Sequence, residues 1–159
     1  MVRLVVGGGV GTPLCADLES CSNASFSGDG QTIAMWLETM DHTDHVVTLD
    51  RKAGHREFVD VNTDGSPVGV SYFAFTSVSD DGNRVGFFPD LDVFVRDRAG
   101  GTTQDVSPPV APGGALVANF GGWISGDGSI VAVDSAFDGY TTPDGRGPVA
   151  DVYVRQLDG

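Results

Sequence analysis

One short turn sequence occurs three times in this chain, and it constrains the fold more than any other feature. The sequence Ser-x-Asp-Gly lies at residues 27–30 and returns at residues 79–82 and 125–128. The copies are therefore 52 and 46 residues apart. Internal repeats with periods of about 40 to 50 residues are typical of propeller blades and related repeat arrays. The chain is therefore expected to be built from three similar units.

Each turn lies between two short apolar segments. The segments that follow the turns are residues 33–36, 85–88 and 131–133. An Asp-Gly pair between short apolar runs is a strong hairpin signal, because both residues tolerate a positive φ angle. Each turn is therefore predicted to join two antiparallel strands. The aspartates predicted to order these turns are Asp29, Asp81 and Asp127.

Further strands follow each hairpin. Alternating apolar residues predict a third strand in every unit, within residues 45–54, 92–100 and 151–159. A fourth strand is predicted at residues 57–61 and 102–106. No window has the apolar spacing and the cap of a helix. The chain is therefore predicted to be all-β, with four-stranded antiparallel blades arranged as a β-propeller.

The two ends suggest a circular shift of this repeat. Residues 3–6 align with the fourth strand at 57–61, whereas the last unit stops after its third strand. We therefore expect a single domain over 1–159. Its parts are an outer strand and loop (1–21), a blade (22–62), a second blade (70–107) and three strands of the last blade (119–159).

At this level of detail the chain resembles the TolB-like β-propeller repeat. The shared pattern is Ser-x-Asp-Gly, an apolar strand, and then Asp-Val-Phe/Tyr-Val-Arg, as at residues 92–96 and 151–155. The first unit departs from it, with His45 in place of the aspartate and Leu49 in place of the arginine. The family usually has proline at the second turn position, which is here Gly28, Asp80 or Gly126. The resemblance implies a blade fold and a binding or scaffolding role, and it transfers no catalytic residues.

Three blades are few for a closed ring, since propellers typically have about 4–8. An open arc exposes sheet faces and an unpaired edge strand, which favours association. A homodimer of six blades is therefore expected, with the N-terminal strand of one copy completing the last blade of the other. A nine-bladed trimer is an alternative. The other alternative is that the chain is a piece of a longer protein.

The charge balance excludes some partners. The chain has 9 Lys and Arg against 22 Asp and Glu, which gives a net charge of −13. Nucleic acids and anionic membrane surfaces select basic faces, so neither is an expected partner. Cationic partners or divalent ions are compatible with this charge. The alternative explanation is solubility and turn formation, because many of the aspartates lie in turns.

The sequence also limits the compartment. No stretch approaches the roughly 20 apolar residues that a membrane-spanning helix needs, so no membrane insertion is expected and the chain should be soluble. The N-terminal apolar run is too short for a signal peptide. The family resemblance nevertheless implies an exported parent protein, either secreted or periplasmic.

Cys15 and Cys21 lie in one loop. They are either a local disulfide, which would favour an oxidising compartment, or two free thiols.

Two segments contain candidate metal ligands. Residues 41–45 contain Asp41, His42, Asp44 and His45, and imidazole with carboxylate suits zinc. The long segment 134–151 contains Asp138 and Asp144 and ends at Asp151, and these oxygen ligands suit calcium. Neither spacing matches a known metal signature. The alternative for the first is a solvated polar loop, and for the second a tolerated surface insertion.

No other cofactor is expected. The glycines at 7–9 and 11 do not open a helix, and no Gly-Lys-Ser/Thr sequence is present, so phosphate binding is not predicted. The repeated serines do not form a nucleophile elbow. Three functions are therefore considered. The first is a non-enzymatic module that binds a protein, peptide or glycan. The second is a metal-assisted hydrolase or lyase, and the third is a structural propeller fragment without a ligand.

Overall fold

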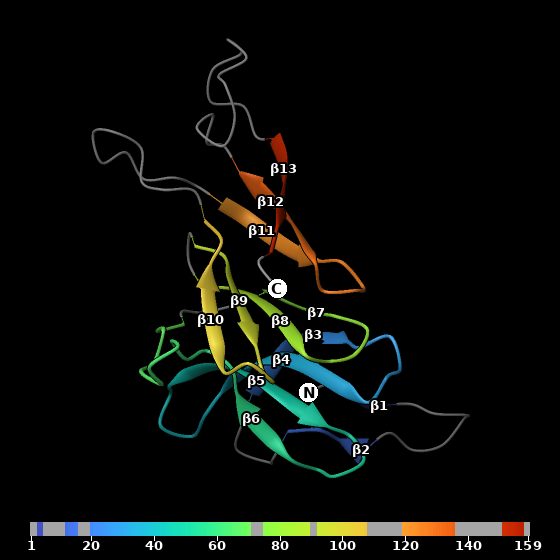
Figure 1. The fold of residues 1–159 in the computed structure, drawn as a ribbon. Helices are drawn as coiled ribbons and strands as arrows, with labels where there is room; N and C mark the ends of the chain where they lie inside the picture. The colour runs from blue at the N-terminus through green and yellow to red at the C-terminus, as the bar shows by residue number, and fades with distance from the viewer. Residues whose placement is uncertain are drawn as a thin grey trace.

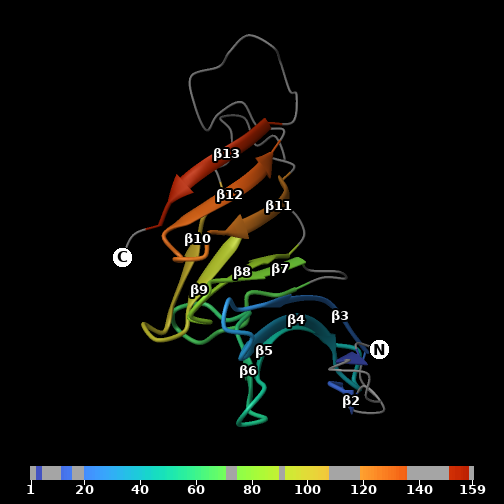
Figure 2. The same cartoon turned by 90° about the vertical axis from the view of Figure 1, so that its right-hand side faces the viewer.

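The computed structural model describes residues 3–4, 12–15, 20–70, 75–89, 92–107, 119–135 and 151–157. In these ranges every regular element is a β-strand, and every strand pair between named strands is antiparallel. Three sheets of three or four strands follow one another along the chain and are stacked face to face (Figures 1 and 2). The predicted all-β architecture is therefore confirmed.

The first sheet has the order β3-β4-β5-β6. Its strands are β3 (Ser20–Phe26), β4 (Thr32–Glu38), β5 (Asp44–Asp50) and β6 (Arg56–Phe58). Nearly all of β4 is buried, because apolar side chains fill both faces of this strand. Strand β6 ends at Phe58, three residues before the end of the predicted strand. Beyond it the chain pairs with its own next segment, because Val61 bridges to Pro67 and the Val68 amide donates a hydrogen bond to the Asp60 carbonyl.

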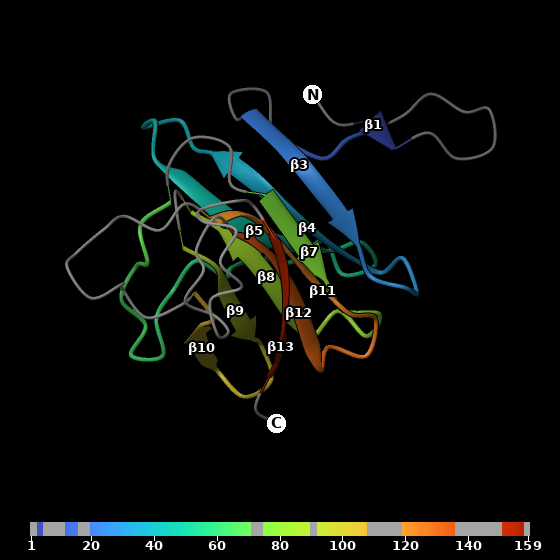
Figure 3. The ribbon, with the colours of Figure 1, turned by 90° about the horizontal axis from the view of Figure 1, so that it is seen from above.

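The second sheet repeats this order as β7-β8-β9-β10, and the third has β11-β12-β13. The strands of the second sheet are β7 (Phe75–Val78), β8 (Arg84–Phe88), β9 (Phe94–Asp97) and β10 (Thr102–Asp105). Those of the third are β11 (Asn119–Ile124), β12 (Ile130–Ser135) and β13 (Asp151–Gln156). The first strands of the three sheets, β3, β7 and β11, lie next to one another (Figure 3).

The N-terminal residues form a separate small sheet. Strand β1 (Arg3–Leu4) pairs with β2 (Thr12–Pro13), two residues with two. The sequence predicts an outer blade strand at residues 3–6. In the described part of the chain Arg3–Leu4 belong to this local pair and to none of the three larger sheets, and completion of a blade by this strand stays a prediction.

The three repeated turns are closed by the same side-chain hydrogen bonds. In the first turn the Ser27 hydroxyl donates to Asp29 Oδ1 over 2.7 Å, and the Thr32 amide donates to Ser27 Oγ over 2.9 Å. The amide of Gln31 also donates to Asp29 Oδ1. Equivalent bonds join Ser79 to Asp81 and Ser125 to Asp127. Short polar side chains that bond nearby backbone groups favour turns, which explains why this sequence recurs.

The second position of each turn lies at a contact between turns. The Asp80 amide donates to the Gly126 carbonyl over 2.7 Å, and the Asp29 amide donates to the Asp80 carbonyl over 3.4 Å. A Cβ atom on Gly28 or on Gly126 would lie 2.5 Å from an Asp80 carboxylate oxygen. The Asp80 side chain therefore fits between the turns because the residues at the equivalent positions, Gly28 and Gly126, have no side chain.

Two apolar clusters hold the sheets together. The cluster between the first and second sheets contains Ala34, Trp36, Val46, Val59, Val85 and Phe87. The cluster between the second and third contains Phe88, Val93, Val95, Val106, Val131, Val133 and Leu157. Burial of such side chains is the main favourable contribution to folding. An ion pair between Arg98 and Glu57, with 2.9 Å between Nη2 and Oε2, also joins the first two sheets.

The turn hydrogen bonds make the stability of the fold dependent on acidity. Donation from the Ser125 hydroxyl, and then from the Ser129 amide, lowers the pKa of Asp127 from 3.8 to about 2. A folded pKa below the unfolded value contributes stability that is fully present above the unfolded pKa. This contribution is lost as the pH falls from about 4 through about 2. The free energy of unfolding of the original chain should therefore fall between about pH 4 and pH 2, and Asp127→Asn should lack the part of this fall that comes from Asp127. Urea midpoints between pH 7 and pH 2 test this, and parallel pH curves for the two proteins would contradict it.

Candidate functional site

The candidate site lies at the end of the first sheet where two connecting segments meet. The loop 39–43 joins β4 to β5, and residues 59–70 follow β6. Loops between the strands of a rigid scaffold are the usual carriers of binding residues. Two of the three histidines of the chain, His42 and His45, lie in this region.

His45 is held by a carboxylate that the fold buries. Its Nδ1 atom lies 2.9 Å from Asp60 Oδ2, and the side chain of Asp60 is 3% exposed against 24% for His45. The Phe58 ring packs on the imidazole, with 4.5 Å between ring centroids. The carboxylate and the aromatic ring therefore fix the orientation of the imidazole. A carboxylate on one ring nitrogen selects the tautomer and leaves the other nitrogen to meet a ligand.

His42 faces a different carboxylate. Its Nδ1 atom lies 2.7 Å from Glu38 Oε1, and this hydrogen bond, together with the charge of Glu38, raises the pKa of His42. The histidine has a φ of 62°, within a turn in which its amide donates to the Thr39 carbonyl. A raised pKa means that the pair stabilises the fold below the ordinary histidine pKa, and that this contribution disappears as the pH rises through the folded pKa. His42 therefore ties the loop to the end of β4.

The two aspartates of the predicted zinc cluster have separate surroundings. The Asp41 carboxylate accepts hydrogen bonds from the Thr39 hydroxyl over 2.6 Å and from the Thr43 amide, and these donors lower its pKa. The pKa of Asp44 is raised, chiefly by burial.

The structure thus gives His42 and His45 different partners. The described residues contain no group of three His, Cys, Asp or Glu side chains that could hold a metal ion. For the calcium prediction, Asp138 and Asp144 lie outside the described residues, whereas Asp151 is the first residue of β13.

The structure joins Cys15 and Cys21 in a disulfide. Their Cα atoms are 6.4 Å apart, and Cys21 lies in β3 with its side chain buried. Leu14 and Cys15 pack against the apolar cluster on the outer face of the first sheet. The backbone carbonyl of Leu14 also accepts a hydrogen bond of 2.9 Å from Arg56 Nη2. The disulfide therefore anchors this segment over the first sheet.

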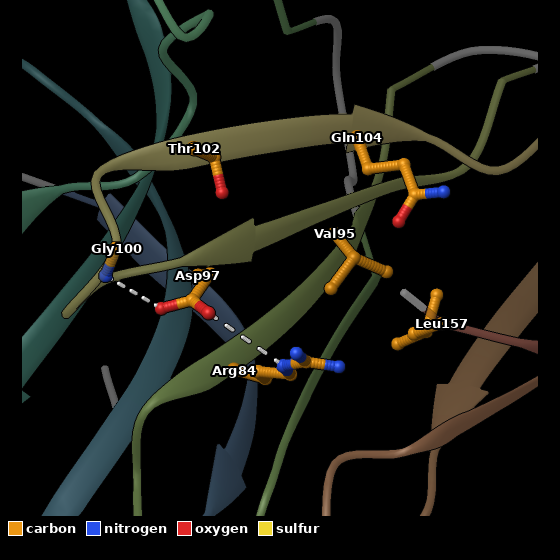
Figure 4. Close-up of a pocket in the computed structure, with 7 residues that line it drawn as sticks. All are labelled: Arg84, Val95, Asp97, Gly100, Thr102, Gln104 and Leu157. Carbon is orange, nitrogen blue, oxygen red and sulfur yellow. Dashed lines mark hydrogen bonds and ion pairs between the residues drawn. The ribbon is translucent and has the colours of Figure 1, made fainter. Parts of the chain in front are cut away.

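A pocket of about 270 Å³ lies between the second and third sheets. It is at the end of the second sheet where β8 begins and β9 ends, whereas the His45 site is at the end of the first sheet where β4 ends and β5 begins. Figure 4 shows Arg84, Val95, Asp97 and Leu157 around it. Arg84 Nε lies 3.8 Å from Asp97 Oδ2, and its Nη1 donates to the Gly128 carbonyl over 2.9 Å. Asp97 also accepts a hydrogen bond from the Gly100 amide. The two charged groups of the pocket therefore neutralise each other and offer little net charge to a ligand, and of the two Arg84 alone joins the second sheet to the third.

Asp60, Glu38 and Phe58 complete the site, and the sequence does not point to them. Asp60 lies 15 residues after His45, in a segment predicted as a strand. Only the antiparallel return of β5 and β6 brings the two together. Asp60 occupies the polar position of an alternating segment, Val59-Asp60-Val61, and this pattern is too common to identify a site.

Comparisons with known proteins concern the fold. No protein-family model and no curated protein matches the sequence. Among solved structures, TolB from Acinetobacter baumannii is similar, with a TM-score of 0.58 and 14% identity over 94% of this chain and 33% of that chain. A putative TolB from Agrobacterium tumefaciens has a TM-score of 0.56 and 15% identity, over 86% of this chain and 43% of that one.

A third similar structure, a prolyl endopeptidase, has a TM-score of 0.55 and 14% identity, and the alignment covers 87% of this chain but only 20% of that chain. The chain thus spans less than half of the length of each of these proteins. In the described ranges the structure has no helix long and apolar enough to cross a membrane. Similarity at this level of identity identifies the architecture alone. The stacked antiparallel sheets of this chain have a TolB-like β-propeller fold.

Proposed function

We propose that this chain is a non-enzymatic binding or scaffold module, which presents the loop end of its first sheet to a peptide or glycan. The observation that carries the proposal is the His45–Asp60 pair, because a buried carboxylate holds a partly exposed imidazole in one orientation. Rigid placement of a polar group lowers the entropy that is lost when a ligand binds. The TolB-like fold supports a binding role.

Exposed apolar side chains next to this pair support ligand binding. Phe58 is about half exposed beside His45, and Met40 in the 39–43 loop is largely exposed. Aromatic and thioether side chains with a few fixed polar groups are typical of recognition surfaces. The described residues offer no comparable support for the metal-assisted enzyme, because they contain no group of three metal ligands.

Peptide and glycan arrays, followed by titration of any hit, test this function. We expect His45→Ala to weaken binding by about tenfold, the effect of losing one hydrogen bond to the ligand. His55→Ala is the matched control, because His55 is exposed on the turn between β5 and β6 and its side chain is away from the site. Equal affinity of the two variants, or no array ligand above background, would contradict the proposal.

We also propose that two copies assemble into a six-bladed ring. The support is the third sheet: among the described residues no fourth strand pairs with β13, whereas β5 and β9 each pair with a fourth strand. The last strand of a three-stranded sheet of this kind can take an antiparallel strand from a partner. A mass in solution of twice 16.5 kDa would support the ring, and 16.5 kDa under every condition would exclude it.

An oxidising compartment fits this module, as for a secreted or periplasmic protein. The support is the Cys15–Cys21 disulfide, because structural disulfides persist mainly outside the reducing cytosol.

A further inference from the structure

The stack of sheets ends in two faces of different character. Within the stack, the face of the first sheet with Trp36 and Val46 packs on the second sheet, and the opposite face of the second sheet packs on the third. We call the face of a sheet that points toward the next sheet along the chain its far face, and the opposite face its near face. Each internal contact therefore joins the far face of one sheet to the near face of the next (Figure 2). This leaves the near face of the first sheet and the far face of the third outside these contacts.

The far face of the third sheet is apolar and exposed. Trp123, Ala132 and Val154 stand in one row across β11, β12 and β13, since Trp123 is opposite Ala132 and Ala132 is opposite Val154. Side chains two residues apart share a face, so Ile130 and Val152 belong to the same surface. Val152 and Val154 are 67% and 69% exposed, and Trp123 is 51% exposed. We call these five residues the open face.

The charge of the open face suits contact with a second copy. Its five members are uncharged, and Asp134 is the one acidic residue among the other described side chains on this side of the sheet. In a chain with a net charge of −13, two copies repel each other over most of their surface. Repulsion is weakest where such an uncharged surface is buried, and exposed apolar patches of this kind mark interaction sites.

The near face of the first sheet is equally apolar, but it is buried. Its residues are Ile33, Met35, Leu37, Val47 and Leu49, which we call the covered face, and each is at most 8% exposed. Leu14 and Cys15 pack against it, tethered by the Cys15–Cys21 disulfide and by the hydrogen bond from Arg56 to the Leu14 carbonyl. The surface that would continue the head-to-tail order of the stack is therefore occupied by the chain itself.

We propose that the open face binds the covered face of a second copy, and that the Cys15–Cys21 disulfide prevents this by holding Leu14 and Cys15 in place. This inference rests on the proposed six-bladed ring and names its interface and its control: in the proposed oxidising compartment the disulfide keeps the chain monomeric, and the ring forms only where a reductant opens it. The contact repeats the far-face to near-face order of the two internal contacts. A dithiol reductant transfers two electrons and two protons to the disulfide. The S–S bond breaks, each Sγ becomes a thiol, and the reductant closes its own cyclic disulfide.

Light scattering on the full chain, with and without dithiothreitol, tests this proposal. We expect 16.5 kDa for the oxidised chain and twice this mass after reduction. The double variant Cys15→Ser with Cys21→Ala should reach the dimer mass without reductant, which separates loss of the tether from any other effect of the reagent. Circular dichroism of each sample establishes that the sheets are retained.

Two further variants locate the interface. Val154→Glu places a charge on the open face and should weaken the reduced dimer by more than about tenfold. Thr102→Glu is the matched control, because it adds the same charge at another exposed β-branched residue on a strand, in β10. It should leave the dimer unchanged.

The outcomes are separable. A dimer in both redox states would overturn control by the disulfide and retain the ring. A monomer in both states would overturn the ring and this inference together. A reduced dimer that tolerates Val154→Glu would overturn the open face as the interface. Loss of the sheets on reduction and in the double variant would also overturn the proposal, because the disulfide would then maintain the fold itself. The array experiment reports on the loop end of the first sheet separately from all of these results.

Discussion

Phe87→Ala is expected to destabilise the chain by about 3–5 kcal/mol, which is the range for loss of a large aromatic side chain from a packed core. Phe87 is fully buried in the cluster between the first and second sheets. Its ring stacks on Phe94, with 5.6 Å between ring centroids and 17° between ring planes. The substitution would remove apolar contacts with both sheets and leave a cavity between them. The midpoint and slope of urea unfolding measure the loss.

Phe75→Ala is the control for this experiment. Phe75 lies in the same sheet, in β7, but about half of its side chain is exposed. Its removal should cost less than about 1 kcal/mol, because surface substitutions outside packed cores have small effects. Similar losses for the two variants would show that the cluster between the first two sheets does not dominate the stability of the chain.

Gly82→Ala is expected to cost about 2–5 kcal/mol, through two separate effects. Gly82 ends the second Ser-x-Asp-Gly turn with a φ of 74°, and a left-handed backbone costs an ordinary L-residue about 1–2 kcal/mol. A Cβ atom there would also lie 2.9 Å from the Cβ of Thr32, the first residue of β4 in the neighbouring sheet. Overpacking of this kind costs about 1–3 kcal/mol more.

Gly54→Ala isolates the contact between the sheets. Gly54 has a φ of 68°, and nothing lies within 4 Å of the position that its Cβ would take. Its substitution should therefore show the backbone cost alone, about 1–2 kcal/mol. Equal losses in urea unfolding at the two positions would mean that Thr32 moves aside freely, and that the turns do not set the spacing between sheets.

The strands and turns could be predicted from the sequence because their signals are local. Ser27, Asp29 and their counterparts bond to atoms within five residues, so the same four-residue sequence closes the same hairpin in each sheet. Alternating apolar residues such as Val131 and Val133 identify a face that must be buried. The ends of the strands could be predicted less accurately, as at β6, which ends at Phe58 because residues 60–61 pair with residues 67–68.

The candidate site could be predicted only in part. The 41–45 segment stands out because histidine and aspartate are dense there. The carboxylates that pair with these histidines do not stand out in the sequence. Glu38 pairs with His42 across a turn, and Asp60 pairs with His45 across the β5–β6 hairpin. The structure shows two separate histidine–carboxylate pairs in this segment, and the partner of His45 could not be predicted because it is 15 residues away in sequence.

The sequence by itself determined that this chain forms β-hairpins in three similar units, since turn chemistry and the period-two apolar pattern act over a few residues. The tertiary structure decided which surfaces are free. Val154 and Val47 are both valines of a third strand, yet one is exposed on the third sheet and the other is buried on the first. The difference arises because a disulfide six residues in span holds Leu14 and Cys15 over the first sheet, whereas none of the described residues covers the third. Leu14 and Cys15 pack there on residues 33–49, and no local pattern in the sequence encodes which segment covers a sheet.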